Sequence, residues 1–344
     1  MTNDPQHMKQ AIFDFPDHIG EAITIGRSIH LRNTYRDIQN VVICGMGGSA
    51  IGGDVVRVLI RDEIRVPLYV NRHYRLPHWV NSKSLVIASS YSGNTEETLS
   101  AFEEARQKGA HILGITTGGT LAERLKADHL DVVLIPGGLQ PRAALAFSFV
   151  PMLFLLRQVG VIQRDWEPTL NAMRETLHGV RDQYARKIPE NPTYALAGKL
   201  AHSLPVIYGE TDFTAVAAIR WKGQLAENSK MLAYVNELPE LNHNEIVGWE
   251  NNADLLERIV LVWLEDKDSH PRVKIRHQIS EKILNSIGIK QETVETDGDD
   301  PAIRFLHCIH YGDWVSYWCA MAHGTDPTPV HKISQLKKEL SQIS

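Results

Sequence analysis

VVICGMGGSAIGGD, residues 41–54, is an apolar strand followed by a burst of glycines and an amphipathic segment. Gly45, Gly47 and Ala50 match the G-x-G-x-x-A spacing of loops in which a strand turns tightly into a helix whose N-terminus binds a phosphate. The pattern leaves three interpretations open: a dinucleotide site, a site for another phosphate-bearing ligand, or a tight turn without a ligand. All three share a strand, a turn and a helix, which together predict a parallel α/β fold.

The same alternation of strands and helices continues along the chain. Strands are expected at residues 41–45, 66–71, 84–89, 111–116 and 131–135, and then at 205–208, 231–235, 258–265 and 291–296. Helices are expected between them, including an apolar one at about 141–159 and others at 212–227, 271–287, 301–322 and 331–341. We therefore predict an α/β fold with two tandem domains, residues 1–160 and 161–344, each a doubly wound parallel sheet flanked by helices.

The composition argues against several classes of partner. The 344 residues carry a net charge of −5, which argues against a broad nucleic-acid surface. The most apolar stretch, residues 143–156, is shorter than the roughly 20 residues of a membrane span and contains Ser148 and Pro151, so we predict no membrane segment. Three cysteines without a framework spacing, together with a polar amino terminus, predict a cytoplasmic protein.

The end of the second predicted strand bears on the dinucleotide interpretation. A dinucleotide site usually places an acidic residue there, where it binds the adenine ribose. Here the strand ends in YVNRHYR, with Asn71 and Arg72 in place of an acid. Because Arg72 is suited to the 2′-phosphate of NADP, an NADP-dependent oxidoreductase stays open as an alternative function.

A hydroxyl-rich loop, SSYSGNTEET at residues 89–98, favours a smaller ligand. Ser90, Ser92 and Thr95 supply three hydroxyls beside a glycine at the start of a predicted helix, where backbone N–H groups and the helix dipole attract an anion. The alternative is a simple helix start, with Thr95 as N-cap before the acidic residue Glu96. That alternative explains Thr95 but not the two serines. Two such loops on neighbouring strands suit one small phosphorylated ligand.

Three charged residues are predicted at helix ends whose dipole disfavours them. Arg142 and Lys332 lie at the amino ends of helices, and Glu227 lies in the last turn of one. Each by itself is consistent with a surface charge, but proteins also break local rules at functional sites. A carboxylate at a negative helix end suits a general base that works near neutral pH. His243, in the polar segment ELNHNEIVGWE, is a candidate acid/base group or a surface cap.

The histidines do not predict a metal site. His307 and His310 share one predicted helix with Cys308, but no third ligand follows with a recognisable spacing. We therefore expect these side chains to serve packing, and we predict no metal ion.

Several motifs in one order are similar to those of a known family. They are GMGGSAIGGD, SYSGNTEET, PRAALAFS, Glu227 sixteen positions before the histidine of NHNEIVGWE, and HKISQLKKEL. From residue 41 to the carboxyl terminus the chain resembles the bifunctional phosphoglucose/phosphomannose isomerases, dimers of chains with two sugar-isomerase (SIS) domains. The resemblance implies a cofactor-free aldose–ketose isomerase that interconverts glucose 6-phosphate and mannose 6-phosphate with fructose 6-phosphate through an enediol. The wider SIS superfamily includes non-catalytic sugar-phosphate sensors, which are a second alternative.

The resemblance also implies roles for individual residues. Those expected to bind the substrate are Gly47, Gly48 and Ser49 beside the sugar and Ser90, Ser92 and Thr95 at the phosphate. Those expected to act in catalysis are Arg142 at the enediolate, Glu227 as proton carrier between carbons 1 and 2, and His243 and Lys332 in ring opening. His243 is expected to come from the second subunit of a homodimer with composite active sites. A threonine before the lysine is expected to permit mannose 6-phosphate, and Thr325 and Thr328 are both candidates.

Overall fold

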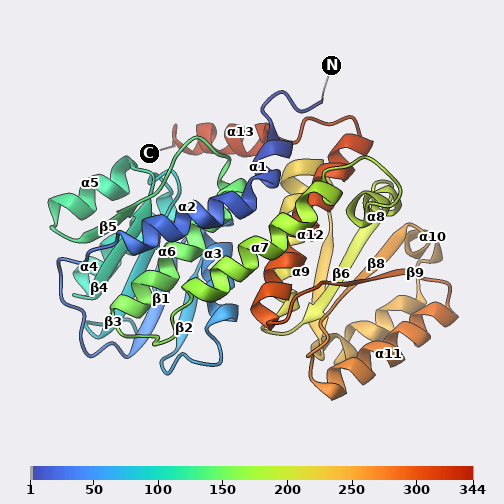
Figure 1. The fold of residues 1–344 in the computed structure, drawn as a ribbon, viewed down its shortest axis with the longest axis horizontal. Coiled ribbons are helices and arrows are strands. Elements are labelled where there is room, and N and C mark those ends of the chain that lie inside the picture. Colours follow the sequence, from blue (N-terminus) through green and yellow to red (C-terminus); the bar gives the residue numbers. More distant parts are fainter. Residues whose placement is uncertain (1–2, 344) are drawn as a thin grey trace. The chain divides into compact units, whose positions relative to one another are not determined.

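The computed structural model describes residues 3–343, which form two compact units (Figure 1). The N-terminal unit is Asp14–Gly179, and the C-terminal unit combines Met1–Phe13 with Val180–Ser344. The division falls within α7 (Glu167–Tyr184). The domains predicted from the sequence motifs are residues 1–160 and 161–344. In the structure, the first helix, α1 (Met8–Phe13), is grouped with the C-terminal residues.

The N-terminal unit contains a five-stranded parallel sheet in the order β2-β1-β3-β4-β5. Its strands are β1 (Asn40–Cys44), β2 (Leu68–Asn71), β3 (Ser84–Ser89), β4 (His111–Thr116) and β5 (Asp131–Leu134). Every residue of β3 is buried, as expected for a strand that is covered on both faces and therefore reads as a continuous apolar run. The predicted parallel sheet is confirmed, and each of the five strands predicted for this sheet agrees with the observed one within two residues.

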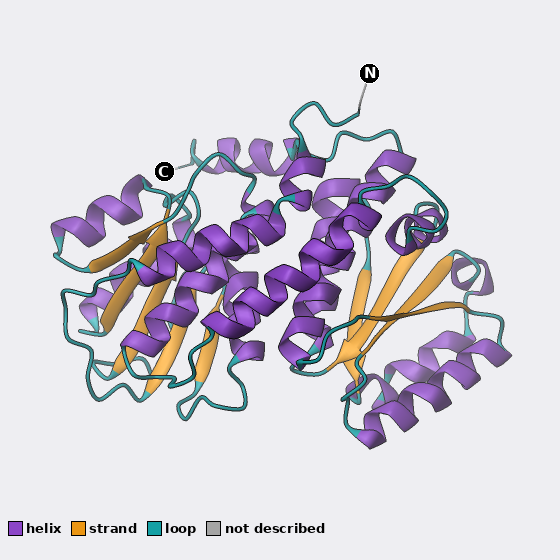
Figure 2. Ribbon diagram, in the orientation of Figure 1, coloured by secondary structure: helices purple, strands orange, loops and turns teal. Residues whose placement is uncertain are grey.

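Helices cover both faces of this sheet (Figure 2). They are α2 (Phe15–Arg27), α3 (Gly47–Leu59), α4 (Glu96–Gln107), α5 (Gly119–Ala127), the short 3-10 helix η1 (Pro141–Ala143) and α6 (Leu145–Gln158). Helices α2, α3 and α6 pack together, whereas α4 and α5 contribute Phe102 and Leu121 to a core with Val42 and Val86. The apolar helix predicted at 141–159 is divided into two parts, η1 and α6, because the chain leaves helical geometry at Ala144.

The C-terminal unit contains a four-stranded parallel sheet in the order β7-β6-β8-β9. Its strands are β6 (Leu204–Glu210), β7 (Tyr234–Leu238), β8 (Ile259–Glu265) and β9 (Lys290–Glu295). The strand predicted at 231–235 was wrong in its position. The preceding helix continues to Ser229, Lys230 then adopts a left-handed φ of 58°, and the Met231 N–H donates back to the Leu225 carbonyl, so the strand begins only at Tyr234.

Helices also cover both faces of the second sheet. The helical segments of this part of the chain are α8 (Pro192–Leu200), α9 (Thr214–Gln224) with the π-helical turn η2 (Leu225–Ser229), η3 (Glu240–His243), η4 (Glu245–Glu250), α10 (Ala253–Leu256), α11 (Pro271–Ser286), α12 (Pro301–Ala322) and α13 (His331–Leu340). Helix α13 is exposed over its whole length and does not cover the sheet. Helix α12 packs against α8 and α9 and is buried over nearly its whole length. On the other face, Tyr208 and Trp263 of the sheet pack with Leu241 and Leu284. Within residues 3–343, no helix is long and apolar enough to cross a membrane.

Candidate active site

Two loops of the N-terminal unit meet where β1 and β3 end. Because β1 and β3 are neighbouring parallel strands, their carboxyl ends lie side by side, which is where ligands bind in such sheets. Gly47, Gly48 and Ser49 form the first turn of α3, directly after β1. The Ser49 hydroxyl accepts a hydrogen bond from the Tyr91 N–H, 3.3 Å away in the loop that follows β3. The two loops singled out in the sequence are therefore joined.

The loop after β3 gathers hydroxyl groups at the start of α4. Thr95 occupies the N-cap position, yet within residues 3–343 its side chain makes no capping hydrogen bond. Its hydroxyl instead lies 2.9 Å from the hydroxyl of Ser90, whose Oγ also accepts the Gly93 N–H at 3.1 Å. The Ser92 Oγ accepts the Asn94 N–H at 3.2 Å. The helix-start interpretation therefore does not account for the Thr95 side chain, and the arrangement resembles an anion-binding turn.

Backbone packing adds Arg142 to the same edge of the sheet. A Cβ at Gly48 would lie 2.7 Å from the Pro141 carbonyl oxygen, so the first turn of α3 touches η1 directly. Arg142 is the central residue of η1, and only 3% of it is exposed. The N-terminal unit thus brings together the glycine loop, the hydroxyl loop and a buried arginine.

In the C-terminal unit, Glu227 lies in η2, the turn that ends α9. Its neighbours fasten this turn to α12. The Asn228 side chain donates to the Ser316 Oγ at 2.9 Å, and the Ser229 hydroxyl donates to the Ser316 carbonyl at 2.6 Å. The half-buried Glu227 is therefore carried by a backbone that is held in place by buried hydrogen bonds.

About two turns earlier, a buried ion pair supports the same helix. The Nε and Nη2 atoms of the Arg220 guanidinium donate to the Asp313 carboxylate, at 3.0 and 2.8 Å, and Gln224 donates to it at 2.7 Å. Burial raises the pKa of Asp313, whereas the charge of Arg220 and the hydrogen bonds from Arg220 and Gln224 lower it. Separating α9 from α12 would leave one buried charge of this pair without its partner, which is costly. The pair therefore holds the two helices together.

The segment after α12 approaches the Glu227 turn. The Lys230 ammonium donates to the Glu227 carbonyl at 2.7 Å and to the Asp326 carbonyl at 2.9 Å. Thr325 is half-buried, whereas only 3% of Thr328 is exposed. Lys332 is exposed in the first turn of α13.

His243 and Glu227 lie at opposite ends of the strands of the C-terminal sheet. Helix α9 begins at the carboxyl end of β6 and runs back along the sheet, so Glu227 lies beside the amino end of β7. His243 is exposed at the end of η3, beyond the carboxyl end of β7. The five residues of β7 alone span about 13 Å. Within one C-terminal unit, therefore, His243 and Glu227 do not meet.

Glu245 anchors the loop that carries His243, and the sequence pattern did not reveal this. Its carboxylate accepts the Tyr234 hydroxyl at 2.7 Å and also accepts the Tyr208 hydroxyl and the Asn236 amide. The hydrogen bond to Glu245 raises the pKa of Tyr234 to about 12. No spacing links these residues in the sequence, and only the pairing of β6 with β7 brings their side chains to one carboxylate.

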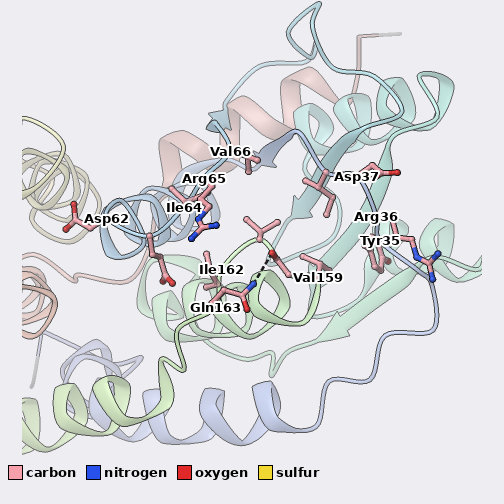
Figure 3. A pocket seen from close by; sticks show the side chains of 14 residues that line it. Tyr35, Arg36, Asp37, Asp62, Ile64, Arg65, Val66, Val159, Ile162 and Gln163 are labelled. Carbon is pink, nitrogen blue, oxygen red and sulfur yellow. Dashed lines mark hydrogen bonds between the residues drawn. The ribbon is translucent and has the colours of Figure 1, made fainter.

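Other features lie away from these loops. A cavity of about 750 Å³ in the N-terminal unit is lined by residues such as Tyr35, Arg36 and Arg65 (Figure 3). These residues precede β1 and β2, so the cavity opens at the amino edge of the sheet, away from the two loops. Arg72, considered above for NADP, pairs with the buried Asp54.

The histidines of α12 are buried and take part in the core. The Tyr184 hydroxyl lies 2.8 Å from His307 Nε2, and the Trp314 N–H donates to His310 Nε2 at 3.1 Å. Burial lowers the pKa of His310 to about 3. Among residues 3–343, no group of three histidine, cysteine or acidic side chains is placed to hold a metal ion.

Comparisons with known proteins identify the family. Residues 189–340 match the family described as the bacterial phospho-glucose isomerase C-terminal SIS domain. A bifunctional phosphoglucose/phosphomannose isomerase from Caldicellulosiruptor bescii is 45% identical over 341 residues, covering 98% of this chain and 99% of the relative. The chain belongs to the bifunctional phosphoglucose/phosphomannose isomerase family.

Further matches agree with this membership. A bifunctional phosphoglucose/phosphomannose isomerase from Aquifex aeolicus is 39% identical over 305 residues, or 88% of this chain and 91% of the relative. The C-terminal domain of glucosamine-fructose-6-phosphate aminotransferase from Francisella tularensis has a similar structure, with a TM-score of 0.72 at 15% identity and coverage of 96% of this chain and all of that one. The latter likeness shows the fold alone. The predicted fold, two SIS-type α/β domains, is confirmed.

Proposed function

We propose that this family member interconverts glucose 6-phosphate and mannose 6-phosphate with fructose 6-phosphate through an enediol. The observation that carries the proposal is the hydroxyl loop, in which Thr95 occupies an N-cap position but faces Ser90. Its hydroxyls and the N-terminus of α4 offer an uncharged cradle for the 6-phosphate. Membership of the family, with 45% identity to a bifunctional enzyme, supports the choice of substrates.

The proposed reaction needs only acids, bases and fixed charges. Hexose 6-phosphates are cyclic, so an acid/base pair first opens the ring. Glu227 then takes the proton from the carbon beside the carbonyl and returns it to the neighbouring carbon, while Arg142 stabilises the enediolate oxygen. Glucose and mannose 6-phosphates differ only at carbon 2, and the enediol loses that stereocentre. A site that accepts both orientations about the bond between carbons 2 and 3 therefore serves both sugars.

Ring opening is assigned to His243 and Lys332, with His243 supplied by a second copy of the chain. Two observations support a homodimer with shared active sites. Glu227 and His243 lie at opposite edges of one C-terminal sheet, so a single unit does not supply both to one substrate. Large apolar side chains are also exposed at both ends of β7: 82% of Leu232, just before the strand, and 66% of Val247, in the segment after His243. Exposed apolar side chains of this size support the proposal that a partner covers part of this unit.

Use of mannose 6-phosphate is assigned to Thr325 rather than Thr328. Thr325 is half-buried in the turn after α12, whereas Thr328 is almost fully buried and its N–H donates to the Asp326 carboxylate at 2.9 Å. A side chain must reach the surface of the site to contact a sugar.

The proposal places the reaction in the cytoplasm and includes no metal or organic cofactor. The three cysteines, all buried and unbridged, support that compartment.

A coupled assay of purified protein tests the function. We expect fructose 6-phosphate to be consumed with formation of both glucose 6-phosphate and mannose 6-phosphate. A sugar-phosphate sensor would bind fructose 6-phosphate without turnover. An NADP-dependent oxidoreductase would bind NADPH tightly, which a fluorescence titration detects; the pairing of Arg72 with Asp54 weighs against it.

Loss of a hydroxyl from the phosphate cradle is expected to raise KM. In Ser92→Ala and Thr95→Ala, one hydrogen bond to a charged oxygen is lost in the ground state and in the transition state alike, so kcat should change little. Such a bond is worth about 1.5–3 kcal/mol, which corresponds to a roughly 10–100-fold rise in KM. Ser100→Ala, on α4 outside the loop, is the control. An unchanged KM in both cradle variants would move the phosphate site elsewhere.

Replacing Glu245 with glutamine is expected to loosen the His243 loop. Removing the carboxylate lowers the pKa of Tyr234 from about 12 toward about 10, because the charge that favoured the neutral phenol is gone. An absorbance titration of tyrosinate measures this shift. We also expect kcat to fall about tenfold, as displaced acid/base groups transfer protons less efficiently. The exposed Glu250→Gln is the control. Native kcat in Glu245→Gln would show that the loop holds its position without the carboxylate.

A further inference from the structure

Lys230 makes an unusual set of contacts at the end of η2. Its ammonium lies within hydrogen-bond distance of four backbone carbonyl oxygens: Glu227 at 2.7 Å, Asp326 at 2.9 Å, Pro327 at 3.1 Å and Asn228 at 3.3 Å. Two of these carbonyls belong to the turn that carries the candidate base. The other two belong to a segment almost one hundred residues later in the chain. The ammonium therefore clasps two remote segments.

The physical basis of this clasp is the end of a helix. The last carbonyls of a helix have no partner within it, and a cation there is favoured by the helix dipole. Lys230 itself is the left-handed residue that ends η2, with φ of 58°, and its N–H donates to the Leu225 carbonyl. Its backbone thus closes the helix while its side chain turns back over the same turn. Capping the helix requires only these contacts with η2 and does not explain the contacts with Asp326 and Pro327.

The second half of the clasp concerns the segment 325–328. The carbonyls of Asp326 and Pro327 face the ammonium, and the Thr328 N–H is held by the Asp326 carboxylate. Thr325, which directly precedes these carbonyls, is tied to the end of α12 by its N–H bond to the Ala320 carbonyl at 2.9 Å. The position of Thr325 relative to Glu227 therefore depends on α12 on one side and on Lys230 on the other.

We propose that Lys230 is a positioning residue that sets the spacing between Glu227 and Thr325, and thereby the relative rates on glucose 6-phosphate and mannose 6-phosphate. The inference rests on the function proposed above for these two residues. Proton transfer at carbon 2 depends on Glu227 for both sugars. Only the mannose reaction is assigned an additional dependence on Thr325, so a change in their spacing affects the two substrates unequally.

Three variants test the clasp in the full-length protein. Lys230→Met removes the ammonium and keeps most of the side-chain length, whereas Lys230→Arg keeps the positive charge with a different shape. Lys222→Met, an exposed lysine near the end of the same helix α9, is the matched control. For each protein, kcat/KM is measured with glucose 6-phosphate and with mannose 6-phosphate, alongside the melting temperature.

We expect Lys230→Met to lower kcat/KM for mannose 6-phosphate about 100-fold, the order of loss that a misplacement of about 1 Å causes. The loss for glucose 6-phosphate should be several-fold smaller, so the ratio of the two values changes. In Lys230→Arg the ratio should return part of the way to its native value, and in Lys222→Met it should stay at the native value.

The outcomes separate this inference from the function on which it rests. Absence of turnover in the unmodified protein would overturn the proposed function itself. If the unmodified protein is active and Lys230→Met melts at a lower temperature with an unchanged substrate ratio, the lysine only caps a helix and the inference is wrong. If Lys230→Met does not fold, Lys230→Gln decides, because it is polar but lacks the charge, and an unaltered ratio in that folded variant contradicts the inference.

Discussion

Glu227→Gln is expected to lower turnover of glucose 6-phosphate and mannose 6-phosphate by about 10²–10⁴-fold, the range typical of a lost general base. Glutamine keeps the size and hydrogen-bonding reach of the side chain but lacks a basic oxygen. The hydrogen bonds that fasten η2 to α12 come from Asn228 and Ser229, so the fold of the turn should survive. Substrate should still bind, because the hydroxyl loop assigned to the phosphate belongs to the N-terminal unit.

Isotope exchange provides the sharper measurement. In deuterated water the native protein should exchange the carbon 2 proton of glucose 6-phosphate, since an enediol releases that proton to the base. Glu227→Gln should lose the exchange together with turnover. The control is Glu257→Gln, an exposed carboxylate at the end of another helix, α10. Near-native turnover in Glu227→Gln would assign the base to another residue, and turnover without exchange in the native protein would indicate a hydride shift.

Mixing inactive Glu227→Gln with inactive His243→Ala should restore activity. If each site takes Glu227 from one copy and His243 from the other, a mixed dimer contains one site with both native residues. Random exchange makes half of the dimers mixed, so about a quarter of the native activity should return. The physical motive is the placement of the two side chains at opposite edges of one sheet.

A second mixture provides the control for this experiment. The segment 326–327 contacts the Glu227 turn within one chain, and Lys332 follows it shortly in sequence, so Lys332 is expected to act with the Glu227 of its own chain. Mixing Glu227→Gln with Lys332→Met should therefore restore nothing. Mass spectrometry verifies that subunits have exchanged. Verified exchange without recovery in the first mixture would show that the active sites are not shared.

Local sequence determined the parallel sheets and the loops at their edges. Buried strands such as β3 appear as uninterrupted apolar runs because both of their faces are covered, and each run ends where glycines and hydroxyls begin. Ser90, Ser92 and Thr95 could be singled out because they lie within one turn of chain. Arg142, Glu227 and Lys332 could be singled out because a helix end is itself a local feature with a known dipole.

The tertiary structure alone decided how these local features combine. Three contacts join residues from different helices and strands: Gly48 with Pro141, the Glu245 carboxylate with the Tyr208 and Tyr234 hydroxyls, and Lys230 with Asp326. The start of β7 was also misplaced, because a π-helical turn and a left-handed Lys230 carry no periodic signal. A sequence pattern reports which face of a strand or helix is apolar; which partner each polar group finds depends on how the chain brings distant segments together, and that becomes visible only in the folded protein.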